Sequence, residues 1–236
     1  VYTVGIIADV HNGAAKFNTD LNNIIDHAGG LENLDGVALI GDIIYTSETA
    51  TPNYDFVTKS EPFNKVKDAG KLMYVMGNHE YPLNATLAKA PEKVELAQKL
   101  FIEKTGEPLE EDTVIGGYHF ISVSSHDYTN SLNAEQEKFI MEHIESALAE
   151  SETKPVFLFL HQTVDLAGPV GGNTHHPCSE NHSVHGVIVQ QSFNRTIRPE
   201  KLYKTDLRIR MLILSQSPAF AQGLADGCFP GKGADL

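Results

Sequence analysis

Residues 2–11 read YTVGIIADVH, a short run of β-prone apolar residues that stops at Asp9 and His11. The same pattern, an apolar run followed at once by polar residues, recurs in three other places. These are VALIGD at 37–42, KLMYVMGNHE at 71–80 and PVFLFLH at 155–161. Continuous apolar runs of this length are typical of strands that are buried on both faces. We therefore predict four buried strands, each of which ends at a polar group.

Segments with helical periodicity lie between these runs. Residues Ala14–Ala28 carry apolar side chains at helical spacing and are followed by Gly29 and Gly30, which favour the end of a helix. Pro91 stands at the favoured first turn of another helix, and Ala134–Glu150 form an amphipathic one. A further strand is predicted at Tyr118–Val123. The alternation of strands and helices indicates an α/β architecture with a covered sheet.

Polar side chains stand at the carboxyl ends of the predicted strands, where the loops of an α/β sheet converge on one crevice. They are Asp9 and His11, Asp42, Asn78 and His79, and His161. Carboxylates, imidazoles and an amide carbonyl together suit divalent metals such as Mn, Fe, Co, Ni or Zn. Mg and Ca are less well suited, because they prefer shells made of oxygen alone. A carboxylate on the middle strand, Asp42, could bridge two ions.

Each of these residues also has a purely structural interpretation. Asp9 and Asp42 could cap helices or form turns, and Asn78 could be a turn residue after Gly77. His161 could be a hydrogen-bonded histidine of the core. Since all of these interpretations would have to hold together, we favour the metal site.

Four short blocks follow one another in order: Asp9-Val10-His11, Gly41-Asp42, Gly77-Asn78-His79-Glu80 and the single His161. They resemble the Asp-x-His, Gly-Asp, Gly-Asn-His-(Asp/Glu) and single-His blocks of the calcineurin-like metallophosphoesterase family. The resemblance covers residues 1–165. One block alone is a weak signal, whereas four that each close a predicted strand are a strong one. The resemblance implies an α/β fold, a four-layer α/β/β/α sandwich of two mixed sheets.

The resemblance also implies a role for each residue at a strand end. The implied metal ligands are Asp9 and His11 for one ion, Asn78 and His161 for the second, and Asp42 as a bridge between both. His79 would be the catalytic residue, which stays off the metals and either protonates the leaving oxygen or stabilises the charged phosphoryl group. Metal-bound water can have a pKa of about 7, which supplies a hydroxide nucleophile without a protein base. The expected activity is hydrolysis of a phosphomonoester or phosphodiester, with two divalent metal ions as cofactors.

The family pattern includes one further block, Gly-His-x-His on a later strand, which this sequence does not contain. Those two histidines would complete the metal shells, so a second interpretation stays open: a catalytically impaired or degenerate metal-binding module. The stretch HHPCSENHSVH is rich in metal-type residues, but its spacing matches neither the block nor a paired zinc motif. We interpret it as a solvated polar loop, and the alternative that it supplies the missing metal ligands stays open. Its metal-type residues are His175, His176, Cys178, His182 and His185.

Composition divides the chain near residue 165. All four arginines and both cysteines lie in residues 166–236, where the alternation of strands and helices fades. We divide the chain into a metallophosphoesterase core at 1–165 and an atypical C-terminal segment at 166–236. Three interpretations of the segment stay open: a divergent sequence with incomplete last strands, a shifted reading frame, or a poorly ordered tail. The codons of residues 215–218 (SQSP), read from the second base, can encode His-x-His-Pro, although the preceding Leu214 cannot become glycine.

Charge and motif content narrow the function further. The formal net charge is −13, which disfavours nucleic acid and acidic membrane surfaces as partners. No apolar run approaches the length of a membrane-spanning helix, about 18 residues. The motifs of P-loop and dinucleotide-binding proteins, serine hydrolases and zinc peptidases are absent. We expect a small soluble phosphate ester as the substrate, and four tyrosines in the loops could stack on its base or aryl group: Tyr45, Tyr54, Tyr81 and Tyr128.

The chain begins at Val1, inside a predicted strand and without a Met or an apolar leader. We therefore expect a trimmed or partial product. A cytoplasmic location and secretion after loss of a leader both stay open, as does the oligomeric state.

Overall fold

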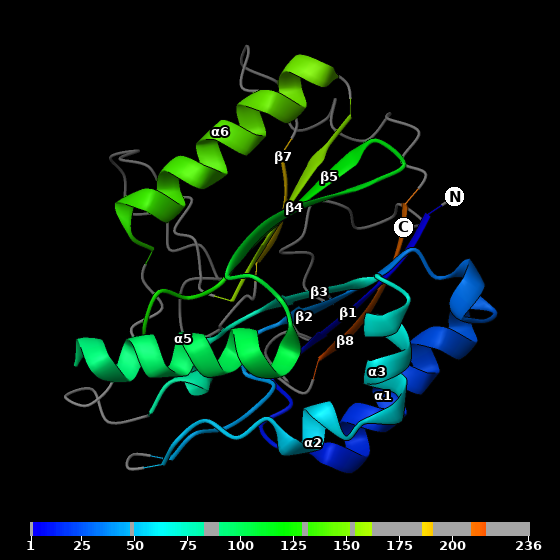
Figure 1. Cartoon of the computed structure of the whole chain (residues 1–236). Helices are drawn as coiled ribbons and strands as arrows, with labels where there is room; N and C mark the ends of the chain where they lie inside the picture. Colours follow the sequence, from blue (N-terminus) through cyan, green and yellow to red (C-terminus); the bar gives the residue numbers. More distant parts are fainter. Residues whose placement is uncertain are drawn as a thin grey trace, which may run out of the picture.

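The structure, a computed structural model, describes residues 2–47, 50–82, 90–128, 132–151, 154–161, 186–190 and 209–215. The described strands form two four-stranded sheets that pack face to face. Helices cover the outer face of each sheet, so that the layers follow the order α/β/β/α (Figure 1). The predicted α/β class and the order of the four layers are confirmed. The expectation of two mixed sheets holds for the second sheet only, because the described strands of the first are all parallel.

The first sheet has the strand order β3-β2-β1-β8, and every pair among these four strands is parallel. Its strands are β1 (Tyr2–Ala8), β2 (Gly36–Ile40), β3 (Leu72–Val75) and β8 (Ile209–Ser215). In the register of the sheet, Ile7 lies opposite Leu39, and Leu39 lies opposite Tyr74. Strands β1, β2 and β3 therefore end side by side, and the loops that follow them start at one edge.

The second sheet has the order β4-β5-β6-β7 and is mixed. Its strands are β4 (Glu110–Ile115), β5 (Tyr118–Val123), β6 (Val156–Leu160) and β7 (Gly186–Gln190). β4 and β5 form an antiparallel hairpin, and its turn residues Gly116 and Gly117 both have positive φ, 60° and 78°. β5 and β6 are parallel, and β6 and β7 are antiparallel. The residue after β6, His161, hydrogen-bonds to the carbonyl of Ile40 at the end of β2, which brings the two sheets together there.

Side chains alternate along the strands and so divide the hydrophobic core. On β1, Ile7 faces the helices, whereas Ile6 and its alternate neighbours face the second sheet. In the layer between the sheets, the rings of Phe120 and Phe157 are stacked with centroids 4.8 Å apart. A fully buried aliphatic or aromatic side chain contributes about 1.5–3 kcal/mol of transfer free energy. Because the strands are covered on both faces, their sequences are continuously apolar.

The helices begin and end where capping residues stand. α1 (Ala14–Ala28) ends at Gly29, which has a left-handed φ of 82° and donates its N–H to the carbonyl of Asp26. α6 (Ala134–Glu150) starts with a capping box formed by Asn133 and Gln136. α6 covers the second sheet. The helices over the first sheet are α1, α2 (Asp55–Thr58), α3 (Glu61–Asp68) and α5 (Pro91–Thr105), and the short 3₁₀ helices are η1 (Leu31–Asn33) and η2 (Asn78–Glu80).

The bounds predicted for the helices Ala14–Ala28 and Ala134–Glu150 and for the strand Tyr118–Val123 are confirmed. The sequence did not predict β4, β7 or β8. β4 reads EEDTVI, in which charged residues open an edge strand and leave no apolar run. β7 and β8 lie in residues 166–236, and β8 shows that residues 209–215 of that segment take part in the first sheet.

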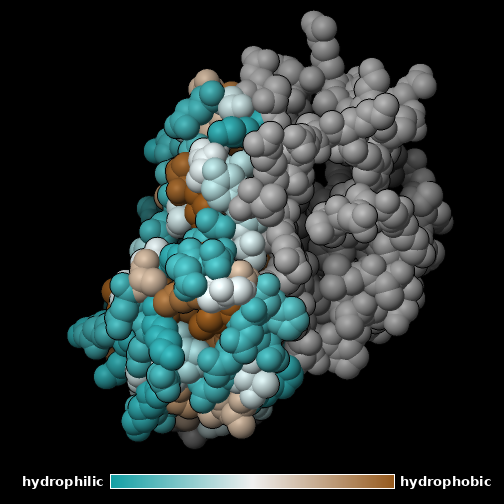
Figure 2. Space-filling model, turned by 90° about the vertical axis from the view of Figure 1, so that its right-hand side faces the viewer, coloured by the Kyte–Doolittle hydropathy of each residue, from teal (hydrophilic) through white to brown (hydrophobic). Residues whose placement is uncertain are grey.

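The described surface in Figure 2 is mostly hydrophilic, and hydrophobic residues form small separate patches on it. The exposed large hydrophobic side chains among the described residues are Tyr45, Leu96, Ile102, Val114 and Met141. None of the helices in the described ranges has the length and apolar character that crossing a membrane would need.

Candidate metal centre

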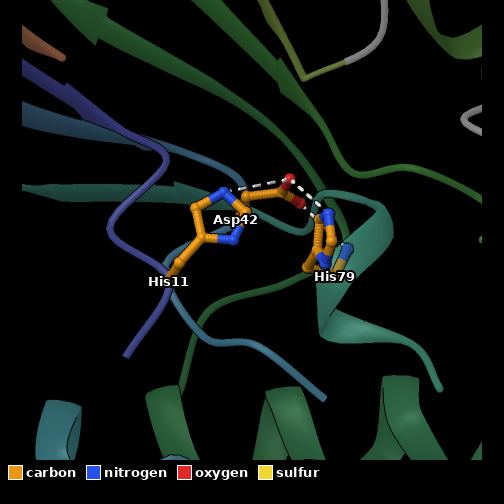
Figure 3. Close-up of side chains that lie close together, drawn as sticks. All are labelled: His11, Asp42 and His79. Atoms are coloured by element: carbon orange, nitrogen blue, oxygen red, sulfur yellow. Dashed lines mark hydrogen bonds and ion pairs between the residues drawn. The ribbon is translucent and has the colours of Figure 1, made fainter. Parts of the chain in front are cut away.

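Four loops bring the polar residues of the strand ends together at one edge of the two sheets. Three of the loops follow strands of the first sheet, and the fourth follows β6 of the second. They carry Asp9, His11, Asp42, Asn78, His79 and His161. Figure 3 shows Asp42 between the imidazole rings of His11 and His79.

The backbone of two of these loops is strained. Among the described residues, the non-glycine residues with positive φ are Asp9 (58°), His11 (50°), Asn12 (64°) and Asp42 (53°). A left-handed conformation costs such a residue about 1–2 kcal/mol. Hydrogen bonds between the loops offset the cost: the N–H of Asp9 donates to the carbonyl of Gly41 (3.2 Å), and that of His11 to the carbonyl of Asp42 (3.0 Å). Strain of this kind is concentrated at functional sites, which agrees with the placement of the polar groups.

Asp42 lies at the centre of the group and is only 3% exposed. Its Oδ2 lies 3.8 Å from Nε2 of His11 and 3.6 Å from Nε2 of His79 (Figure 3). The same oxygen lies 3.2 Å from Nε2 of His161. Its Oδ1 accepts the backbone N–H of His79 at 2.9 Å. Burial raises the pKa of Asp42, but the hydrogen bond from His161 and the positive charges of His161 and His79 hold it below its usual value. Asp42 is therefore an ionised carboxylate with one oxygen facing three imidazoles.

His161 is buried and has a defined orientation. Its Nδ1 donates to the carbonyl of Ile40 at 3.0 Å, which directs Nε2 toward the site. Nε2 lies 3.2 Å from Oδ2 of Asp42 and 3.2 Å from Oδ1 of Asn78. Burial lowers the pKa of His161, but the hydrogen bond and charge of Asp42 outweigh burial and raise the pKa to about 9. A proton or a metal cation between these three atoms satisfies all of them.

The possible ligand atoms form two overlapping groups. Those of Asp9, Asp42 and His161 lie within 4.8 Å of one another, and so do those of His11, Asp42 and His79. Asp42 belongs to both groups, which is the placement that a bridging carboxylate requires. Carboxylate and imidazole donors, with an amide oxygen beside them, suit divalent ions from Mn to Zn. The donor atoms of these residues could therefore hold a divalent metal ion.

His79 is more exposed than Asp42, with 22% of its side chain exposed against 5% for Asp42. Its ring meets that of His11 edge to face at 4.6 Å and stacks on that of Tyr45 at 5.1 Å. Burial and the charges of His11 and His161 lower the pKa of His79 more than Asp42 raises it. Its Nδ1 has no hydrogen-bond partner among the described residues. The Nε2 of His79 lies as close to Asp42 as that of His11, so distance alone does not separate His79 from the ligands.

Glu80, which the sequence marked only as the end of a block, holds two of the loops together. It is fully buried. Its Oε2 accepts the backbone N–H groups of Gly77 (2.6 Å) and Asp42 (2.9 Å), and its Oε1 accepts those of Ile43 (2.9 Å) and Ile44 (3.2 Å). Burial and the charge of Asp42 raise the pKa of Glu80 to about 7, although the N–H donors oppose them. Glu80 thus ties the loop after β2 to the loop after β3.

Two glycines next to the site are required by close packing. Gly41 has a φ of 66°, and a Cβ at this position would lie 2.5 Å from Nδ1 of His161. A Cβ at Gly77 would overlap Oδ1 of Asp42 and lie 2.7 Å from Cδ2 of His161. Both glycines therefore make room for predicted ligands.

The C-terminal segment approaches the same edge through β8. The last residue of β8, Ser215, pairs with Ala8, which directly precedes Asp9. Residues 216–218 of the SQSP stretch lie outside the described residues. So do His175, His176, Cys178, His182 and His185, and the structure gives no position for that cluster.

Comparison with protein families places most of the chain in a known family. The family described as calcineurin-like phosphoesterase matches residues 2–189. The match includes every predicted site residue and continues past residue 165 into β7. A search of curated proteins returned no match.

Proposed function

The chain belongs to the calcineurin-like phosphoesterase family, and we propose that it hydrolyses a small phosphate ester with the help of two divalent metal ions. Metal-dependent hydrolysis of phosphoesters follows from the family. The number of ions, the residues that hold them and the size of the substrate are the proposal.

The observation that carries the proposal is the place of Asp42 in two groups of possible ligands. Following the family pattern, we assign Asp9 and His11, whose Oδ1 and Nε2 atoms lie 3.7 Å apart, to one ion and Asn78 and His161 to the other, with Asp42 shared. The two groups of ligand atoms divide these residues differently, because they place Asp9 with His161 and His11 with His79. Bound ions of this type supply Lewis acidity, which makes water a better nucleophile and neutralises the charge of a phosphoryl group. The chain's own contribution is to hold these side chains rigidly, through Glu80 and the strained loops.

His79 is proposed as the catalytic residue. The partial exposure of its side chain, 22%, beside the buried Asp42 supports a direct contact with the substrate. In this position the imidazole can donate a proton to the leaving oxygen or donate a hydrogen bond to the phosphoryl group.

A second candidate function is a degenerate metal-binding module. The observation that favours it is the register of β8, which ends beside the metal centre at Ser215, a serine rather than a histidine. If no other residue completes the shells, each ion keeps fewer protein ligands and binds more weakly.

One experiment separates the two functions. The full chain is treated with chelator and loaded with Mn²⁺, and the bound metal per chain is measured. Hydrolysis is then measured with p-nitrophenyl phosphate, a monoester, and bis-p-nitrophenyl phosphate, a diester. Two ions per chain and metal-dependent turnover of either ester support the phosphoesterase. Metal binding without turnover supports the degenerate module, and no metal binding overturns both. Asp42→Asn should abolish binding and turnover. The matched control is Asp55→Asn. It makes the same exchange at an exposed carboxylate at the start of α2, which pairs with Lys59.

A further inference from the structure

Tyr45 is an exposed aromatic residue at the edge of the metal centre. It is 45% exposed, and its ring stacks on that of His79 with centroids 5.1 Å and planes 24° apart. The ring of His11 lies 6.1 Å away on the same side of the site. Exposed tyrosines are common, but Tyr45 contacts His79, the residue that we propose to be in contact with the substrate.

The structure distinguishes Tyr45 from the other three loop tyrosines. Tyr54 and Tyr81 are only 2% and 0% exposed. The hydroxyl of Tyr81 donates to the carbonyl of Ser125 at 2.8 Å, so it serves the core. Tyr128 packs against the core between the first sheet and its helices. Of the four, Tyr45 alone combines exposure with a contact to the centre.

The backbone of Tyr45 is clamped on both sides. Its N–H donates to Oδ1 of Asn12 at 3.0 Å, and its carbonyl accepts Nδ2 of Asn12 at 3.0 Å. The next N–H, that of Thr46, donates to the carbonyl of His79 at 3.0 Å. Asn12 makes its two bonds from a left-handed backbone with a φ of 64°. A strained residue that fixes the backbone of an exposed ring indicates a preorganised contact surface.

Under the proposed function, on which this inference rests, the leaving oxygen lies beside His79. The group attached to that oxygen then lies beside Tyr45, which is stacked on His79. We propose that Tyr45 forms one wall of the leaving-group site and selects phosphate esters whose alcohol is a flat aromatic group. Aromatic rings gain from stacked or edge-to-face contact with tyrosine, whereas a saturated ring of the same size makes only hydrophobic contact.

The test compares phenyl phosphate with cyclohexyl phosphate, and the methyl diesters of both, so that monoester and diester activity are covered. The measured quantity is the ratio of kcat/KM for the phenyl ester to that for the cyclohexyl ester. The intrinsic difference in reactivity is the same for every variant, so a change in the ratio reports the side chain alone. Tyr45→Leu should lower the ratio by about 3- to 10-fold, as expected for one aromatic contact.

Two variants serve as controls. Tyr45→Phe keeps the ring and should keep the ratio. Tyr2→Leu makes the same exchange as Tyr45→Leu at the amino end of β1, opposite the metal centre, and should not change the ratio.

Binding gives a readout that needs no turnover. Phenylphosphonate and cyclohexylphosphonate cannot be hydrolysed, and their Kd values for the Mn²⁺-loaded chain are measured by calorimetry. The preference for the phenyl compound should fall in Tyr45→Leu by a factor similar to that in the kinetic ratio.

The outcomes distinguish this inference from the proposed function. If Tyr45→Leu slows both esters equally and the ratio is unchanged, Tyr45 only positions His79 and the inference is overturned. If the wild-type chain hydrolyses neither class of ester, the proposed function fails. The binding of the two phosphonates then tests the aromatic wall by itself. A phenyl preference in binding that Tyr45→Leu removes still supports the aromatic wall, whereas no preference overturns it.

Discussion

Nε2 of His161 lies 3.2 Å from Oδ2 of Asp42, and this contact joins the two sheets at the candidate metal centre. Asp42 follows β2 of the first sheet, and His161 follows β6 of the second. Both residues are buried, so removal of either one leaves the other without its charged partner in the interior. The same contact therefore serves both the packing of the sheets and the geometry of the site.

The metal-free protein should lose stability as the pH rises from about 6.5, the usual histidine value, toward 9. Burial lowers the pKa of His161, but the hydrogen bond and charge of Asp42 outweigh it and raise the pKa to about 9. The folded state thus holds the proton of His161 more tightly than the unfolded state does. The stability that this proton contributes is complete below the pKa of the unfolded state and is lost as the pH rises through the pKa of the folded state. Its size is about 3 kcal/mol at most.

Denaturant unfolding in chelator at pH 6, 8 and 9.5 measures this dependence. The same measurement is made on His161→Asn. The difference in unfolding free energy between wild type and this variant at each pH cancels the effect of the other titrating groups. Equal differences between the two proteins at all three pH values would show that the prediction is wrong.

Glu80→Gln should weaken both the fold and the metal site. A glutamine offers one acceptor oxygen, and its NH₂ group would face N–H donors that the carboxylate now accepts. We expect a loss of about 1–3 kcal/mol in the free energy of unfolding and of about 10- to 100-fold in Mn²⁺ affinity. Calorimetry gives the affinity and denaturant unfolding the stability.

Glu61→Gln on α3 is the control for this exchange, because Glu61 is exposed and pairs only with Lys65 among the described residues. It should change stability by no more than about 0.5 kcal/mol. Unaltered Mn²⁺ affinity in Glu80→Gln would contradict the role assigned to Glu80.

Gly41→Ala should disturb the site more than backbone strain alone explains. The new methyl group would lie 2.5 Å from Nδ1 of His161, which must then move away from Asp42. Gly70→Ala is a close control, because its φ of 64° matches the 66° of Gly41 and no atom lies within 4 Å of its Cβ position. Each variant pays about 1–2 kcal/mol for the left-handed backbone, but Gly41→Ala alone should lose metal. Bound Mn²⁺ per chain checks this, and equal metal content in the two variants would refute it.

His119 should stabilise the second sheet in a pH-dependent way, independently of metal. Its Nδ1 lies 2.8 Å from Oδ2 of Asp112, and its Nε2 lies 3.2 Å from Oε2 of Glu150. Burial lowers the pKa of His119, but the two hydrogen bonds and the two charges raise it above its usual value overall. The contribution is therefore complete below about pH 6.5 and is lost as the pH rises through the folded pKa.

The measurement is the difference in Tm between wild type and His119→Gln. The difference should be larger at pH 5.5 than at pH 9, with or without Mn²⁺. A difference that grows with pH would have the wrong sign for this arrangement.

The sequence determined the features that depend on neighbours in the chain. Continuous apolar runs mark the strands β1, β2, β3 and β6, because burial against two layers favours such runs, and β5 was predicted separately as a β-prone segment. The polar blocks that follow β1, β2, β3 and β6 predicted which residues form the candidate metal centre, and the structure brings these residues together. Gly29 and Gly30 located the C-terminal end of α1, and Pro91 located the start of α5, for the same local reason.

The tertiary structure decided what depends on residues far apart in the chain. β8 pairs with β1 over a separation of about two hundred residues, so no local pattern in the sequence predicts this pairing. The four N–H groups that Glu80 accepts come from two loops, and the exposure of Tyr45 but not of Tyr54 or Tyr81 depends on packing. Periodicity reports which residues are buried, whereas the partner of a buried charge and the neighbour of an exposed ring exist only after the loops have met.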